Sequence, residues 1–195
     1  MTQTDPPSSE NFPPGESDDG AAARAPRHEP ETPQAAVALS HEGEALALAL
    51  PDALAIYGVD VGAAIDEVVC RVPVDHVVEV CRQLKDEPGF AFDYLRLLTV
   101  VDYVEQDGEF EVVYHLYSLG NHHKMMLKAR TPEGRPSVPS VTGVWRGADW
   151  YEREMHDLFG VDFPGHPNLV PLVLPDDFEG YPGRKSYPLN DYEEW

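Results

Sequence analysis

The sequence predicts an α+β fold, in which a small mixed sheet with an antiparallel meander is covered by helices and continues into an extended C-terminal arm. Three observations support this prediction. Short segments with alternating apolar and polar residues recur between residues 67 and 130. Segments with apolar residues at helical spacing flank them. Beyond residue 160, frequent prolines exclude a helix or a central strand.

The composition limits the size of the fold and its partners. A chain of 195 residues predicts one domain with its own core. Its 35 acidic residues outnumber 14 basic ones, and the formal charge of −21 would repel nucleic acids and anionic membrane surfaces. No segment approaches the roughly twenty apolar residues that span a bilayer, and the N-terminus lacks the pattern of a secretion signal. We therefore expect no nucleic-acid partner and a cytoplasmic chain that reaches a membrane only through other proteins.

The chain divides into three predicted parts, which are a disordered acidic tail over 1–36, an α+β domain over 37–160 and an extended arm over 161–195. Residues 1–34 contain seven prolines and seven acidic residues, and Phe12 is their only large apolar residue. They cannot bury enough surface to offset the entropy of ordering. This composition predicts a tail without a fixed structure.

The domain begins with a predicted helix, a strand and a second helix. The segment Glu44–Tyr57 is rich in Ala and Leu and predicts a helix, which Pro51 should interrupt or restart. In Glu67–Val72, apolar and charged positions alternate as in a strand with one buried face, and Pro73 ends this strand. From Val74 to Leu84, apolar residues recur at helical spacing and predict an amphipathic helix.

Three consecutive strands are predicted next. Leu95–Val101 is mostly apolar, as in a more central strand, and Phe110–Leu116 shows a period of two. The dipeptide Asp107-Gly108 between them is a hairpin signal. Met125–Ala129 alternates again and supplies the third strand. Consecutive strands with short connections predict an antiparallel meander.

A further helix is predicted to begin at Asp149. Asp149 as N-cap and Glu152 three residues later have the spacing of a capping box, and Gly160 stands where a C-terminal glycine is expected. The face that we expect to be buried consists of Tyr151, Met155, Leu158 and Phe159.

This helix also carries the side chains that are chemically most suggestive. Glu152 and His156 are four residues apart and could act as acid and base or, with His166, hold a metal ion, as in an autonomous metal-dependent hydrolase. The spacing matches no zinc motif. The alternative is an ion-paired helix face, because Arg153 and Asp157 are also four residues apart.

No nucleotide or iron–sulfur site is predicted. Cys70 and Cys81 are too few to bind a cluster and match no zinc pattern, so we expect two small buried side chains. His115, His122 and His123 are expected at the surface. Neither a glycine-rich dinucleotide loop nor a Gly-Lys-Ser/Thr sequence occurs. We therefore expect no cofactor in this chain and interpret it as a binding protein.

The arm combines six prolines with several large aromatic side chains. The prolines exclude regular hydrogen bonding, whereas aromatic residues are the usual anchors of interfaces. We expect the arm to bind a partner in trans, through aromatic anchors and the basic pair Arg184-Lys185. This pair either interacts with acidic residues of the arm or meets an acidic partner. The anchors that we expect include Phe178, Tyr181 and Tyr187.

Several stretches of the chain together follow the pattern of one known family. The longest runs from Trp150 to Leu169 and the next from Leu174 to Leu189, and two shorter stretches upstream are Phe110–Leu116 and Pro136–Thr142. They resemble the thirty-kilodalton subunit of the respiratory NADH:quinone oxidoreductase, complex I. The similarity extends in order from Glu67 to Leu189, which is more specific than one short motif.

The resemblance implies a small α/β domain in the peripheral arm of complex I, without flavin, quinone or iron–sulfur cluster. This domain would contact the large quinone-pocket subunit and the iron–sulfur subunits, and lie at the cytoplasmic side of the cell membrane. The enzyme of this family oxidises NADH, reduces quinone and translocates ions. The residues that we assign to partner binding are Glu152, Arg153, Glu154, Asp157, His166, Phe178, Tyr181, Arg184, Lys185 and Tyr187.

The chain departs from the family pattern at two places. Val170 and Pro171 stand where the family usually has two arginines, and Gly183 and Ser186 replace a Leu and an Asp. These departures leave room for a related assembly, namely a membrane-bound hydrogenase or an oxidoreductase linked to cofactor F420 or ferredoxin, because these complexes use relatives of the same subunit.

Overall fold

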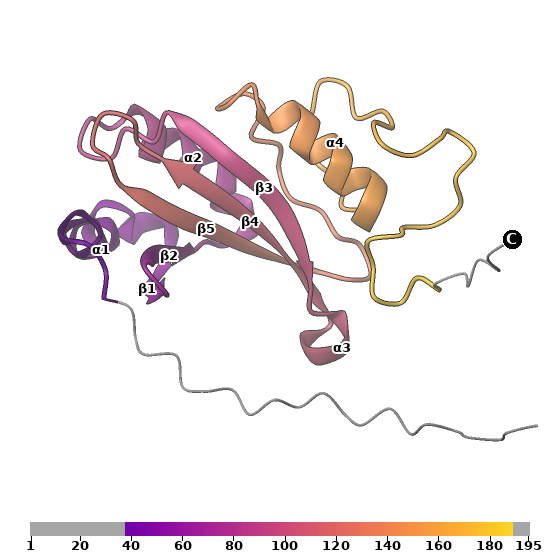
Figure 1. Ribbon diagram of the computed structural model, residues 1–195, viewed down its shortest axis with the longest axis horizontal. Coiled ribbons are helices and arrows are strands. Elements are labelled where there is room, and N and C mark those ends of the chain that lie inside the picture. The colour runs from indigo at the N-terminus through magenta and orange to yellow at the C-terminus, as the bar shows by residue number, and fades with distance from the viewer. Residues whose placement is uncertain (1–37, 189–195) are drawn as a thin grey trace, which may run out of the picture. The chain divides into compact units, whose positions relative to one another are not determined.

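A mixed five-stranded sheet forms the centre of the computed structural model, which describes residues 38–188 (Figure 1). The strand order is β1-β2-β5-β4-β3, in which β2 and β5 are parallel and the other neighbours are antiparallel. The predicted meander β3-β4-β5 and the α+β class are confirmed. The strands are β1 (Asp60–Ala64), β2 (Glu67–Arg71), β3 (Tyr94–Asp102), β4 (Glu109–Tyr117) and β5 (Lys124–Pro132).

Four helices and two 3-10 turns accompany the strands. None of the described helices is long and apolar enough to cross a membrane. The predicted tail, 1–36, and the end of the arm from residue 189 lie outside the described residues. The helices are α1 (His41–Ala53), α2 (Val77–Asp86), α3 (Val104–Asp107) and α4 (Ala148–Phe159), and the turns are η1 (Ala55–Tyr57) and η2 (Val74–His76).

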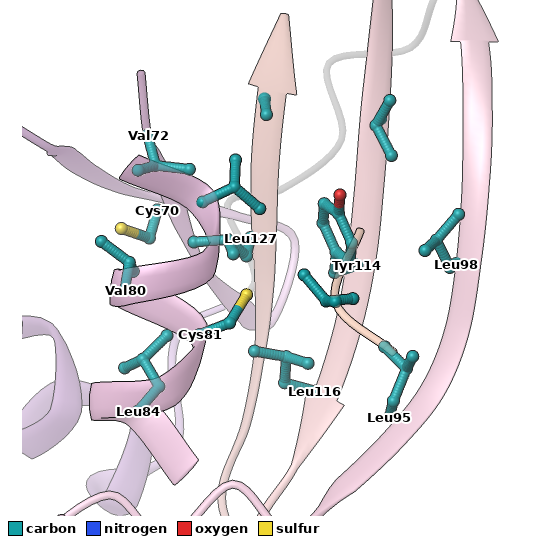
Figure 2. Packing of buried hydrophobic residues seen from close by; sticks show 14 of the residues in the cluster. Cys70, Val72, Val80, Cys81, Leu84, Leu95, Leu98, Tyr114, Leu116 and Leu127 are labelled. Carbon is teal, nitrogen blue, oxygen red and sulfur yellow. The ribbon is translucent and has the colours of Figure 1, made fainter. Parts of the chain in front are cut away.

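One face of the sheet carries the hydrophobic core. The alternation along β4 places Val112, Tyr114 and Leu116 in this core, and Leu127 of β5 lies beside them. Figure 2 shows Cys81 and Leu84 of α2 pointing toward these strand residues. Both cysteines are buried and free, as predicted. Burial raises the pKa of the Cys70 thiol to about 12, so this thiol stays protonated at neutral pH. The helices contribute further core residues, among them Leu46, Leu50, Val77, Val80 and Met155.

The opposite face of the sheet carries charged side chains. Glu111 of β4 accepts hydrogen bonds from Lys128 Nζ at 2.8 Å and from Arg130 Nε at 3.2 Å, across the β4–β5 pair. Burial opposes ionisation of Glu111, but the two cations outweigh it and lower the pKa of this carboxyl group. Charged and core residues therefore alternate along β4 and β5, as the period of two predicted.

Three features differ from the predictions. Pro51 does not interrupt α1, because it lies in the last turn, where its missing N–H costs a single bond and Leu54 N still donates to Leu50 O. β3 is an edge strand and not a central one. Its apolar composition is explained by packing of α4 against it. The strand β1 was not predicted, since its small, mostly exposed residues show no alternation.

The turn between β1 and β2 contains a strained residue. The pairing of Ala64 with Glu67 leaves a two-residue turn, in which Ile65 has a φ of 59° and is 67% exposed. Such turns favour Asn or Gly at this position, because a β-branched side chain fits the left-handed region poorly.

We predict that Ile65→Asn stabilises the protein by about 1 kcal/mol, because Asn adopts the left-handed conformation at lower cost. Thermal unfolding of the full chain would show this as a higher midpoint. The matched control is Ile56→Asn, since Ile56 is 82% exposed and does not have a positive φ. An equal change in both variants would contradict a strained turn.

Candidate partner-binding site on helix α4 and the C-terminal arm

The described part of the arm, 161–188, runs back along α4 and then returns toward its C-terminal end (Figure 1). Its first residues belong to the core, because Val161 and Phe163 are fully buried. The polar side chains of α4 then bind the backbone of the arm. The helix thereby supplies the hydrogen bonds that the prolines deny to the arm itself.

Asp157 holds the middle of the arm. Its Oδ2 atom accepts hydrogen bonds from the backbone N–H groups of Leu172 at 2.7 Å and Val173 at 2.8 Å, and a longer one from Leu174 at 3.4 Å. A carboxylate that receives successive amides forms charge-assisted bonds, which are stronger than neutral ones. The side chain is nearly buried, which protects these bonds from water.

Arg153 binds the arm one turn earlier. Its Nε donates to Val170 O and its Nη2 to Pro171 O, both at 2.9 Å. Arg153 and Asp157 therefore bind consecutive backbone groups of the arm, and the ion pair predicted between them is replaced by these contacts. The departure from the family pattern at residues 170 and 171 does not affect them, since only backbone carbonyls are used.

The arm returns to the end of α4 at Gly183, whose N–H donates to Leu158 O at 2.8 Å. Arg184 Nε then donates to Phe159 O at 2.7 Å. The guanidinium carbon of Arg184 lies 5.0 Å from the ring centroid of Phe110 and 4.5 Å from that of Tyr181. Cation–π contacts of this kind contribute about 0.5–2 kcal/mol each. Arg184 thus binds its own domain, contrary to the contact in trans that we expected for the basic pair.

Two further contacts complete this end of the arm. The N–H of Lys185 donates to Asp102 Oδ2 at 2.9 Å, and the other carboxylate oxygen of Asp102 accepts from Val104 N at 2.9 Å. Asp102 therefore ties the arm to the β3–β4 connection, a role that no sequence signal indicated. The Tyr181 ring packs on Gly160, which has a φ of 68°, and a Cβ atom at this glycine would lie 2.5 Å from the ring.

Glu152 occupies an internal position. Its side chain is fully buried, and Oε1 accepts a hydrogen bond from Val141 N at 2.7 Å. The predicted capping box is wrong, because α4 begins at Ala148 after Gly147, and no side chain caps it. Asp149 therefore lies inside the first turn. Glu152 makes an internal contact in place of the partner contact that we expected.

The three side chains considered for a hydrolase have separate roles. His156 Nδ1 donates to Val161 O at 2.9 Å, at the C-terminal end of α4. His166 lies at the other end, where Nδ1 accepts from Asn168 N at 3.0 Å. The proton of His166 must then be on Nε2, which is 3.0 Å from Asp149 Oδ1. Within 38–188, no three His, Cys, Asp or Glu side chains form a group that could hold a metal ion.

Other predicted residues lie at the surface of the arm. Phe178 and Tyr181 are both 40% exposed, and Phe178 stacks on Tyr187 with ring centroids 6.1 Å apart. The Lys185 side chain is exposed, and that of Glu154 is partly exposed. Partner binding stays a prediction for these residues.

Three exposed apolar residues of the same elements were not among our predicted site residues. Trp150 in the first turn of α4 is 65% exposed, and Val170 and Val173 of the arm are exposed as well. A signal for Trp150 was available, since it falls outside the predicted buried face of the helix. We name Trp150, Val170, Val173, Phe178 and Tyr181 together the outer apolar set.

Comparison with protein families and curated proteins gives consistent matches. Residues 70–193 match the model of a family described as respiratory-chain NADH dehydrogenase, 30 Kd subunit. The second of the C subunits of the NADH-quinone oxidoreductase of Rhizobium meliloti (strain 1021) is 44% identical over 135 residues, which cover 69% of this chain and 74% of that protein. The corresponding C subunit of Roseiflexus sp. (strain RS-1) is 43% identical over 152 residues, covering 77% and 84%.

Solved structures show the same fold. A trypsin-resistant fragment of Nqo5 superposes with a TM-score of 0.56 at 30% identity and covers 64% of this chain and 98% of the fragment. A chain of the membrane-bound sulfane sulfur reductase, an archaeal respiratory membrane complex, superposes with a TM-score of 0.63 at 27% identity. This match covers 78% of the present chain and 96% of the other.

We predict that Gly160→Ala destabilises the protein by about 2–4 kcal/mol, because the left-handed backbone costs about 1 kcal/mol and the clash with Tyr181 adds about 1–3 kcal/mol. Gly108→Ala is the matched control, since Gly108 has a φ of 73° and no atom within 4 Å of the added Cβ. Denaturant unfolding of the full chain measures both. Equal losses in the two variants would show that Tyr181 does not press on Gly160.

Proposed function

Because the chain belongs to the family of the 30 kDa subunit of the respiratory-chain NADH dehydrogenase, we propose that it is a structural subunit in the peripheral arm of a proton-translocating NADH:quinone oxidoreductase. In this proposal, the chain carries no catalytic site. NADH, flavin, iron–sulfur clusters and quinone are bound by other subunits. The chain reaches the cytoplasmic side of the cell membrane only through the complex.

The observation that carries this proposal is the use that the chain makes of its motif side chains. Arg153, Asp157 and Arg184 bind backbone groups, and they fix the path of the arm on α4. Catalytic charges usually converge on a cleft where a substrate can reach them. Here the motif builds a shaped surface, which is what a subunit needs for assembly.

The outer apolar set is the proposed contact with the large quinone-pocket subunit. Aromatic residues are enriched among interface anchors, and Trp150 is one of the most exposed large side chains in the described chain. Since the arm already lies on α4, binding would not have to order it again, and less of the interaction energy would be lost. Neighbouring iron–sulfur subunits complete the proposed environment.

A second candidate assembly has support from one observation. The sulfane sulfur reductase chain covers more of this chain than the Nqo5 fragment does, with 78% against 64%. The same scaffold could therefore serve a related membrane-bound hydrogenase or an oxidoreductase linked to F420 or ferredoxin. The two candidates differ in the electron donor that the co-assembled subunits accept.

The direct test is to purify the tagged full chain from its native membrane in mild detergent. We expect flavin-containing and iron–sulfur subunits to copurify, and the preparation to reduce a quinone with NADH. Copurification of subunits that use another donor and do not oxidise NADH would favour the second candidate. A chain that purifies alone would contradict both.

Substitutions can locate the contact surface. We predict that Trp150→Ala combined with Val173→Ser lowers the amount of assembled complex at least several-fold, because each removes an exposed anchor, while the isolated chain keeps its unfolding midpoint. Leu48→Ala on α1 is the matched control, since Leu48 is 80% exposed on another element. Normal assembly of the double variant would place the contact elsewhere.

A further inference from the structure

Two buried polar atoms face the core without a hydrogen-bond partner among the described residues, and they are Glu152 Oε2 and Tyr114 Oη. Both side chains are fully buried. Buried polar atoms are nearly always paired in folded proteins, so an unpaired carboxyl oxygen in a core calls for an explanation. None of the contacts between α4 and the arm uses either atom.

The surroundings of the Glu152 carboxyl group disfavour its charge. Burial raises its pKa to about 7, and the Asp149 carboxylate on the same helix adds to this effect, whereas the Val141 amide and Ser140 hydroxyl oppose it. Tyr114 of β4 and Cys81 of α2 lie near enough to have their own pKa raised by this carboxylate. Among the described residues, the groups that shift the pKa of Glu152 include no cation.

The carboxyl group also holds one segment of the chain in place. Oε1 receives the Val141 amide, and Val141 lies in the segment 138–147, which connects the strands to α4. The segment contributes Trp145 to the core, where Nε1 of its ring donates to Phe92 O at 2.9 Å. Lys85 of α2 donates to Val144 O in the same segment. Its packing therefore depends on a few named contacts, of which the Glu152 contact is the one whose acceptor titrates near neutral pH.

We propose that Glu152 is a proton-dependent latch, which holds the segment 138–147 against α4 more firmly when its carboxyl group is protonated than when it is ionised. In the protonated form, Oε2–H is a donor in a site where the Tyr114 hydroxyl is the acceptor without another partner. Oε1 still accepts from Val141. In the ionised form, a charge is buried without a counter-ion, and opening of the segment relieves it. This inference does not depend on the proposed function.

The direction of the pH effect follows from the protons bound in each state. When the segment opens, the carboxyl group meets water and its pKa returns toward 4.5, whereas in the closed state it is about 7. Between these values the closed state binds more protons, so its stability falls as the pH rises. The opening equilibrium should increase by up to about tenfold per pH unit in this window and become constant above about pH 7.

Amide hydrogen exchange of the full chain tests the latch. We expect the protection of the Val141 and Trp145 amides, after correction for the intrinsic exchange rate, to fall about tenfold per pH unit between about pH 5 and 6.5 and to become constant at higher pH. In Glu152→Gln, which keeps the acceptor but does not titrate, this slope should be lost. Glu154→Gln on the same helix is the matched control and should keep the slope.

A second variant covers the case in which Glu152→Gln does not fold. Asp149→Asn removes the neighbouring negative charge, keeps an oxygen for His166, and should shift the plateau to lower pH with a smaller total loss of protection. A slope that persists in Glu152→Gln, an unchanged plateau in Asp149→Asn, or a wild-type chain whose protection is independent of pH would each overturn the latch.

Discussion

The carboxylate of Asp157 is the interaction on which the arrangement of the arm depends. One oxygen atom receives the amides of residues 172–174, and Arg153 takes the two carbonyl groups just before them. A proline-rich segment cannot satisfy its backbone groups by itself, and burial of unpaired groups is costly. Once these groups are bound to α4, the rest of the arm can return to Leu158 and place Arg184 over the ring of Phe110. The aromatic side chains then lie on a surface whose backbone is already fixed.

This arrangement explains why a motif rich in charges need not be a catalytic motif. The side chains of Arg153 and Asp157 have the spacing of an ion pair, yet each finds its partner in the backbone of the arm. A partner protein that meets a preformed surface loses less conformational entropy than one that must order a free arm. For a subunit without chemistry of its own, this saving is a physical reason to keep the charged motif. The buried Glu152 is different, because its charge serves neither the arm nor the outer surface.

Most of the fold could be predicted from the sequence, and the misses have physical causes. The strands β4 and β5 and the helix α2 follow from side-chain periodicity, because their buried and exposed faces are sharply divided. The strand β1 is held by pairing with β2, and its exposed Gly and Ala residues carry no such division. At the site, the sequence identified the motif residues but not their partners. The contact of Asp157 with Leu172 depends on a backbone path that no local pattern specifies.

The most direct test of this account is whether the arm is bound to α4 before any partner is present. Amide hydrogen exchange of the isolated full chain would measure this at Leu172 and Val173, whose N–H groups are bound to Asp157. The account predicts protection of these amides at least about tenfold above unstructured chain, loss of that protection in Asp157→Ala, and its retention in Glu154→Ala, corresponding to a bond worth about 1.5–3 kcal/mol. Exchange of these amides at the rate of an unstructured peptide in the wild-type chain would contradict it.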